Sequence, residues 1–229
     1  MRVYLVGVGR MGRVVARSLA PVVDLVLVGR DQEKLAAAAA EFGAGTAPLE
    51  TDFAGAAAVI LALPTESTAD VLAAIAPRIP AEAVVINIAT AVMRSSLNHL
   101  VPDEQLAAAK FVAHYYDLEA GGKAMLVVEA GSPRTEAITK EIMGHCGPVV
   151  AGKEEWVLTT NRAATEEAVR LALRMRRRME MAGIPPEIIH QATTGVAVGS
   201  LRAFMDGRLG PFGQAVAERV LVELERKGL

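Results

Sequence analysis

The sequence predicts an α/β protein with a doubly wound, mostly parallel sheet, followed by an all-helical region. In residues 1–152, short apolar runs rich in β-branched residues alternate with stretches of helical periodicity. Several runs, such as residues 84–88, are continuously hydrophobic, as strands buried on both faces are. From residue 154 onward no run is typical of a strand, and apolar residues recur at helical spacing. We therefore expect two domains, residues 1–152 and 153–229.

The expected strands are short and apolar: residues 3–6, 25–28, 58–63, 84–88, 110–113, 124–129 and 148–150. The expected helices between them cover residues 11–19, 32–42, 67–76 and 134–145. In the second domain one helix ends at Gly183, another begins at Pro185 and Pro186 and continues to Gly207, and a third covers residues 214–227. A domain this small buries only a thin core by itself, so we expect these helices to form a homodimer.

Composition and charge exclude several classes of function. The chain has 24 basic and 26 acidic residues and a net charge of -2, so it offers no field that would attract nucleic acid. A single cysteine, Cys146, excludes an intrachain disulfide, and its apolar neighbours favour a buried thiol. No histidine or acidic cluster has metal-ligand spacing, so we expect no metal. The longest apolar run, residues 54–64, is too short to span a bilayer, and the chain opens on a strand without a leader. We expect a cytoplasmic protein without membrane contact.

A glycine-rich turn follows the first expected strand and opens the first expected helix, with the sequence Gly7-Val8-Gly9-Arg10-Met11-Gly12. In such a turn the first glycine permits the sharp bend, the second lets the backbone approach a pyrophosphate, and the third lets helix and strand pack closely. The helix N-terminus then presents free N–H groups to the phosphates. This context predicts a Rossmann-type, NAD(P)-binding domain, with a purely structural turn as the alternative.

The residues after the second strand indicate NADP in preference to NAD. Gly29 stands where an NAD-selective site places an acidic residue on the ribose, and Arg30 follows with a guanidinium suited to a 2′-phosphate. Lys34, one turn into the next helix, adds a second positive charge. In the alternative interpretation Arg30 is a solvated turn residue and Asp31 caps the helix or binds the ribose.

Two further turns are expected to line the cofactor cleft, because ligands of open parallel sheets bind at the carboxyl ends of the strands. One is Leu63-Pro64-Thr65, and the other contains Ala89. Alternatively, either turn serves only to end its strand and contacts no ligand.

Hydride transfer needs a group that donates a proton or polarises the substrate, and His114 is the first candidate. It ends an expected strand and precedes two tyrosines. His190 is next, and with Thr194 it lies on the polar face of the second C-terminal helix, where it can meet a substrate across the dimer. A half-buried strand-end histidine and a solvated helix face are the alternatives.

Four segments, VGVGRMG, the Gly29-Arg30 pair, AVILALP and VVINIATAV, resemble pyrroline-5-carboxylate reductase in their order and spacing. Related deazaflavin-dependent NADP reductases share the N-terminal part of this pattern. The resemblance implies reduction of a C=N bond by NADPH and an intertwined helical dimer that closes over the nicotinamide.

Two segments depart from that family. Its Gly-Ser-Gly-Pro-Ala segment is replaced by residues 159–163, TTNRA, and its Gly-Gly-Thr-Thr turn by residues 210–215, GPFGQA, which lack both threonines. These departures keep two alternatives open: a non-catalytic or regulatory dinucleotide-binding protein, and a dehydrogenase of the hydroxyacid or prephenate type. The segment Ala120-Gly121-Gly122 is faintly similar to the glycine-rich substrate loop of the hydroxyacid dehydrogenases.

Overall fold

The computed structural model describes residues 1–228, which form two compact units, Met1–Ala163 and a second that begins at Ala164. The division lies within the long helix α6 (Glu154–Met181), further along the chain than residue 152. The first turns of α6 belong to the first unit because Val157 is buried there. In addition, the Asn161 side-chain amide donates a hydrogen bond of 2.8 Å to the carbonyl oxygen of Phe111.

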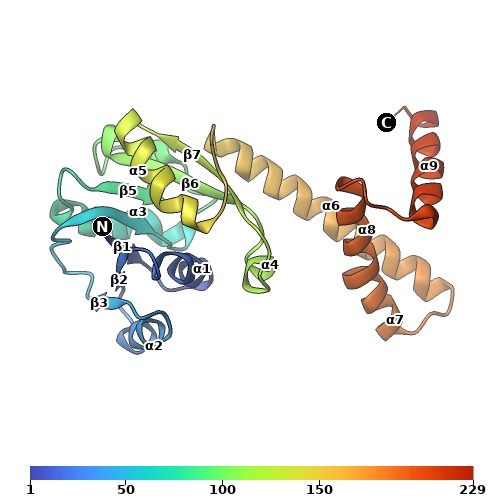
Figure 1. Ribbon diagram of the computed structural model, residues 1–229, viewed down its shortest axis with the longest axis horizontal. Helices are drawn as coiled ribbons and strands as arrows, with labels where there is room; N and C mark the ends of the chain where they lie inside the picture. Colours follow the sequence, from blue (N-terminus) through green and yellow to red (C-terminus); the bar gives the residue numbers. More distant parts are fainter. Residues whose placement is uncertain (229) are drawn as a thin grey trace. The chain divides into compact units, whose positions relative to one another are not determined.

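The first unit contains an eight-stranded sheet of order β3-β2-β1-β4-β5-β6-β7-β8 (Figure 1). All neighbouring strands are parallel except β6 and β7. The strands are β1 (Arg2–Val6), β2 (Asp24–Val28), β3 (Gly45–Ala47), β4 (Ala56–Leu61), β5 (Val84–Asn87), β6 (Leu106–Val112), β7 (Met125–Ala130) and β8 (Val149–Ala151). The expected doubly wound, mostly parallel sheet is thus confirmed. The strand order reverses between β1 and β4, which is where such sheets bind ligands.

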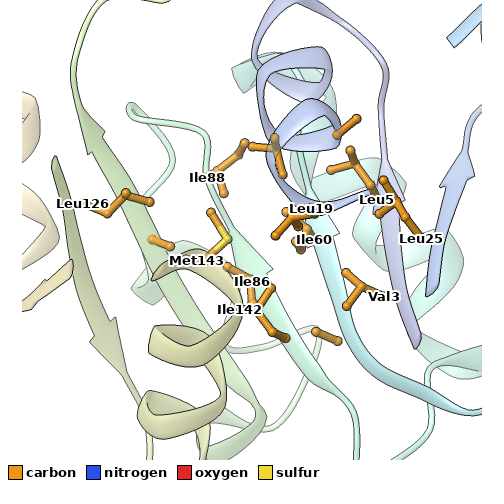
Figure 2. Close-up of a cluster of buried hydrophobic side chains, with 14 of the residues drawn as sticks. Val3, Leu5, Leu19, Leu25, Ile60, Ile86, Ile88, Leu126, Ile142 and Met143 are labelled. Carbon is orange, nitrogen blue, oxygen red and sulfur yellow. The ribbon is translucent and has the colours of Figure 1, made fainter. Parts of the chain in front are cut away.

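Helices cover both faces of the sheet. The helices of this unit are α1 (Arg10–Leu19), α2 (Gln32–Phe42), α3 (Thr65–Ile75), α4 (Tyr115–Glu119) and α5 (Pro133–Met143). On one face, side chains of α1, α2 and α5 form a core with the strands, and Figure 2 shows Leu5, Leu19, Ile60 and Met143 among its members. On the other face α3 packs with the chain between β5 and β6. Sheet and helices together fix the carboxyl ends of the parallel strands as one rigid edge.

Three local expectations were wrong. The strand expected at residues 110–113 is β6, which begins earlier, at Leu106. Its first half was missed because it consists largely of alanines, which favour helices but here lie fully buried in the sheet. The strand expected at residues 58–63 ends at Leu61. Short elements were missed: β3, which is mostly exposed, and α4, which has no buried residue.

Among its described residues the second unit contains helices joined by short turns and no strand, as the sequence predicts. After α6 come α7 (Pro186–Gln191), a π-helical turn (Ala192–Ala197), α8 (Val198–Met205) and α9 (Pro211–Arg226). Gly183 and Gly207 have φ values of 73° and 66°, in the left-handed region that glycine tolerates at helix ends. Among its described residues the only buried hydrophobic side chain is Ile189. This unit therefore has almost no core within one chain.

Candidate functional site

The glycine-rich turn connects β1 to α1 at the reversal of strand order. Gly7 has a φ of 100° and its N–H donates a 2.9 Å hydrogen bond to the carbonyl oxygen of Val28, which joins the turn to β2. A β-carbon on Gly12 would overlap the carbonyl oxygen of Gly7, so these two glycines are required by the turn itself. A β-carbon on Gly9 would have no atom within 4 Å. The space beside Gly9 is thus open.

Helix α1 begins directly at this open space. Its N-cap is Gly9, no side chain caps it, and its first turn holds no acidic residue. The first N–H groups of an α-helix have no partner within the helix, so these are available to an external acceptor. With the helix dipole they favour an anion such as a pyrophosphate.

A cavity of about 550 Å³ extends from this turn along the carboxyl ends of β1, β2 and β4. Eight of the cofactor residues expected from the sequence line it: Gly7, Gly9, Arg10, Gly29, Arg30, Lys34, Leu63 and Pro64. Four others lie outside the lining. Met11 packs against the core, Gly12 lies against Gly7, Thr65 begins α3, and Ala89 lies in the loop after β5.

The cavity also has lining residues that the sequence analysis did not single out, among them Arg13, Asp31, Leu49, Ser67 and Glu119. Arg13 follows Arg10 by three positions, which puts both on one face of α1, so helical spacing could have found it. Glu119 belongs to the short helix α4, and no local pattern connects it with the glycine turn.

The charged residues after β2 have definite partners. Asp31 caps α2 by accepting a 3.1 Å hydrogen bond from the Lys34 backbone N–H, and its other oxygen lies 2.8 Å from Lys34 Nζ. Hydrogen bonding to Lys34 lowers the pKa of Asp31 below its ordinary value. Arg13 pairs with Glu41. Among the described residues no carboxylate forms an ion pair with Arg30, whose charge is left uncompensated.

Arg10 is held by Tyr115, the first residue of α4. Its Nη1 donates a 2.9 Å hydrogen bond to the Tyr115 hydroxyl, and its guanidinium carbon lies 4.6 Å from the centre of the tyrosine ring. The His114 ring is 4.8 Å from the same ring. His114 caps α4, since its Nδ1 accepts a hydrogen bond of 3.4 Å from the Tyr116 backbone N–H. In its neutral form the imidazole therefore carries its proton on Nε2.

His190 and Thr194 belong to the helical unit. They line a separate cavity of about 320 Å³ in the helical unit, together with Arg176 and Glu180, which form a 2.8 Å ion pair. The Thr194 hydroxyl donates a 2.9 Å hydrogen bond to the carbonyl oxygen of His190.

Within residues 1–228 no cluster of histidine, cysteine, aspartate and glutamate is arranged to bind a metal ion. The helices of the same residues include none with the length and apolar character needed to cross a membrane.

Comparison with known proteins gives a family for the N-terminal segment and a fold for the whole chain. Residues 2–91 match the family model described as NADP oxidoreductase, coenzyme F420-dependent. No curated protein sequence matches the chain. Among solved structures, a pyrroline-5-carboxylate reductase from Coxiella burnetii is 16% identical, with a TM-score of 0.75 over 99% of this chain and 90% of the other.

Two further structures have the same fold at similarly low identity. The pyrroline carboxylate reductase of Plasmodium falciparum, solved with NADP bound, is 14% identical, with a TM-score of 0.66 over 100% of this chain and 90% of the other. The prephenate dehydrogenase of Aquifex aeolicus is 14% identical, with a TM-score of 0.64 over 98% of this chain and 96% of the other. By sequence, therefore, residues 2–91 are similar to the NADP oxidoreductase family, and the chain as a whole has the fold seen in the pyrroline-5-carboxylate reductases.

Proposed function

We propose that this protein is an NADP(H)-dependent oxidoreductase that acts on a small imine or carbonyl compound, as pyrroline-5-carboxylate reductases do. One observation carries the proposal: a cavity of about 550 Å³ lies at the strand-order reversal and is lined by Gly9, beside which there is open space. Helix α1 begins there without a side-chain cap. These groups fit a pyrophosphate because they combine open space, free N–H donors and a positive dipole. When bound, NADPH would supply the hydride.

The preference for NADP over NAD is supported by the state of the two residues after Gly29. Both oxygens of Asp31 already interact with Lys34, so a ribose hydroxyl would share this carboxylate with the α2 N-terminus and the lysine ammonium. Arg30 lines the cavity and has no carboxylate partner in the described part of the chain. A guanidinium in that state suits a 2′-phosphate.

His114 is the residue we assign to the reacting end. It stands at the carboxyl end of β6, and the hydrogen bond at Nδ1 leaves an Nε2–H as donor. Its Nε2–H would donate a hydrogen bond to the substrate nitrogen or oxygen and so polarise the bond whose carbon receives the hydride, and the proton that completes the reduction would come from water. His190 and Thr194 remain weaker candidates, since their own cavity lies in the helical unit.

A homodimer is supported by the side chains of the helical unit. Leu173, Leu201, Phe204 and Phe212 are between 49% and 85% exposed, and only Ile189 among its described hydrophobic residues is buried. Large apolar side chains exposed in this number favour an interaction site. Sedimentation equilibrium should give twice the chain mass, and Phe204→Glu should shift the distribution toward the monomer. A monomer at micromolar concentration would contradict this assignment.

The decisive experiment is calorimetric titration with NADPH and NADH at one ionic strength, followed by a substrate screen that monitors NADPH absorbance. Tight binding of NADPH alone and oxidation of NADPH by a cyclic imine would support the proposal. Activity only with hydroxyacids or prephenate-like alcohols would favour the dehydrogenase alternative. The prephenate dehydrogenase of Aquifex aeolicus has the same fold as this chain. Binding without any turnover would favour a regulatory protein, and binding of neither nucleotide would remove the proposal.

A further inference from the structure

A lysine lies completely buried in the middle of the sheet. The side chain of Lys110, on β6, is 0% exposed, and its Nζ donates hydrogen bonds to the carbonyl oxygens of Ala89 (2.5 Å) and Val92 (2.7 Å). Its counter-ion is Glu154 at the start of α6, whose Oε2 is 3.4 Å from Nζ. Burial lowers the pKa of Lys110 to about 8 and raises that of Glu154. The pair therefore holds charge in a place where charge is costly.

These side chains fix the loop that follows β5. Asn87, itself fully buried, donates through Nδ2 to the Val92 carbonyl oxygen (2.7 Å) and accepts at Oδ1 from the Ala89 N–H (3.0 Å). Glu154 accepts a 2.5 Å hydrogen bond from the Arg94 N–H. Lys110, Asn87 and Glu154 thus bind both ends of a six-residue backbone segment, residues 89–94, which has little freedom to change shape.

Stability alone does not require a charged pair here. Apolar residues of similar volume in place of a buried ion pair are often neutral or stabilising, whereas a buried pair can specify one conformation. The pair interacts with backbone atoms of the loop, so the conformation that it specifies is that of residues 89–94.

The position of this loop relates it to the cofactor. In a doubly wound sheet a dinucleotide lies across the reversal of strand order, with one mononucleotide half on each side. Arg30 places the adenosine half at β1 and β2, so the nicotinamide half belongs at β4 and β5. The loop begins there, and the Ile88 N–H donates a 3.2 Å hydrogen bond to the Leu61 carbonyl oxygen at the end of β4.

We propose that Lys110, together with Glu154, is a positioning residue for the nicotinamide half of the cofactor, acting through the backbone of residues 89–94. This inference rests on the proposed function. Lys110 itself does not contact the cofactor. The buried pair instead fixes the shape of the loop surface against which the nicotinamide would lie.

The test compares two ligands that share the adenosine half. The double variant Lys110→Met/Glu154→Gln removes both charges, keeps the volumes, and leaves an amide oxygen to accept from Arg94. Its affinity for 2′-phospho-ADP-ribose, which lacks nicotinamide, should stay within about twofold of wild type, while its affinity for NADPH should fall about tenfold. The fluorescence of bound NADPH should move toward that of free NADPH. Lys153→Met, at an exposed lysine beside Glu154, is the matched control and should change neither affinity.

An equal loss for both ligands would mean that the pair only stabilises the fold, and no loss for either would mean that it does not shape the nicotinamide surface; each result overturns this inference alone. If wild type binds neither ligand, the proposed function and this inference fall together. Should the double variant not fold, Glu154→Gln decides: a loss of about threefold or more for NADPH only is expected, and an equal change for both ligands overturns the inference.

Discussion

Two glycines of the turn should respond oppositely to substitution, although both belong to one motif. Gly9 has φ -68° and ψ -169°, a conformation open to any residue, and a β-carbon there meets no atom within 4 Å. Gly12 has no such room, because a β-carbon would overlap the backbone of Gly7. The free protein should therefore tolerate a side chain at Gly9 and not at Gly12.

The informative change is Gly9→Val. Its cost to the fold is the loss of a favourable N-cap residue, about 1 kcal/mol, which lowers the melting temperature by about 2–4 °C for a chain of this size. Its cost to binding is larger, because the valine methyl groups occupy the space beside the α1 N–H groups. We expect the affinity for NADPH to fall by at least about a hundredfold.

Gly12→Ala is the contrasting variant. The forced shift of the Gly7 backbone costs about 1–3 kcal/mol, offset by at most about 1 kcal/mol of helix propensity, so the melting temperature falls even if some NADPH still binds. Thermal unfolding followed by circular dichroism and titration with NADPH separate the two cases. A Gly9→Val protein that binds NADPH like wild type would refute the assignment of the open space to the pyrophosphate.

Three further predictions concern charge and protonation. Replacing Arg30 by Ala should lower the affinity for NADPH by about 10- to 100-fold, the contribution of a charge-assisted hydrogen bond, and the affinity for NADH by less than about twofold. Equal losses of affinity in calorimetric titrations would contradict the 2′-phosphate role. Burial raises the pKa of Cys146 to about 11, so roughly one thiol in a thousand is ionised at pH 8, and a disulfide reagent should label it far faster in urea than in the native protein. Burial lowers the pKa of Lys110 to about 8, below the ordinary 10.5, so between these values the unfolded chain binds more protons and the unfolding free energy rises with pH. In denaturant unfolding, the unfolding free energy of wild type minus that of Lys110→Met/Glu154→Gln should therefore increase from pH 8 to pH 10. A constant difference would contradict the lowered pKa.

The parts of the fold that the sequence predicted well are those with strong local signals. Strands β1, β2 and β5 are continuous apolar runs, and α2 has Asp31 as its N-cap and Gly43 at its end, so its expected bounds agree with the structure. The missed elements lack such signals. Strand β3 has three residues and is held by its pairing with β2, and α4 depends on the cap that His114 provides.

Strand direction and long-range pairing could not be predicted from local pattern. Strand β7 has an apolar run like that of β6, yet the two strands pair in antiparallel orientation. The partner of Lys110 is Glu154, on another element far along the chain, so periodicity alone gives no reason to bury this lysine. Likewise, the contact of Arg10 with Tyr115 joins residues 105 positions apart. The cavity residues around the glycine turn and after β2 were therefore predictable from consecutive residues, whereas the role proposed for the loop after β5 depends on tertiary contacts.

The distribution of free positive charge around the cavity gives a physical reason for the proposed preference for NADP. Arg13 and Lys34 are neutralised by Glu41 and Asp31. Arg10 is held by a tyrosine hydroxyl and ring, which fix its guanidinium without cancelling its charge, and in the described residues neither Arg10 nor Arg30 forms an ion pair with a carboxylate. Uncompensated charge thus remains at two points, beside the glycine turn and after β2. A dinucleotide with phosphates at its centre and on its adenosine ribose would match both points, and NADP has that composition whereas NAD lacks the ribose phosphate, which is the physical basis of the proposed preference.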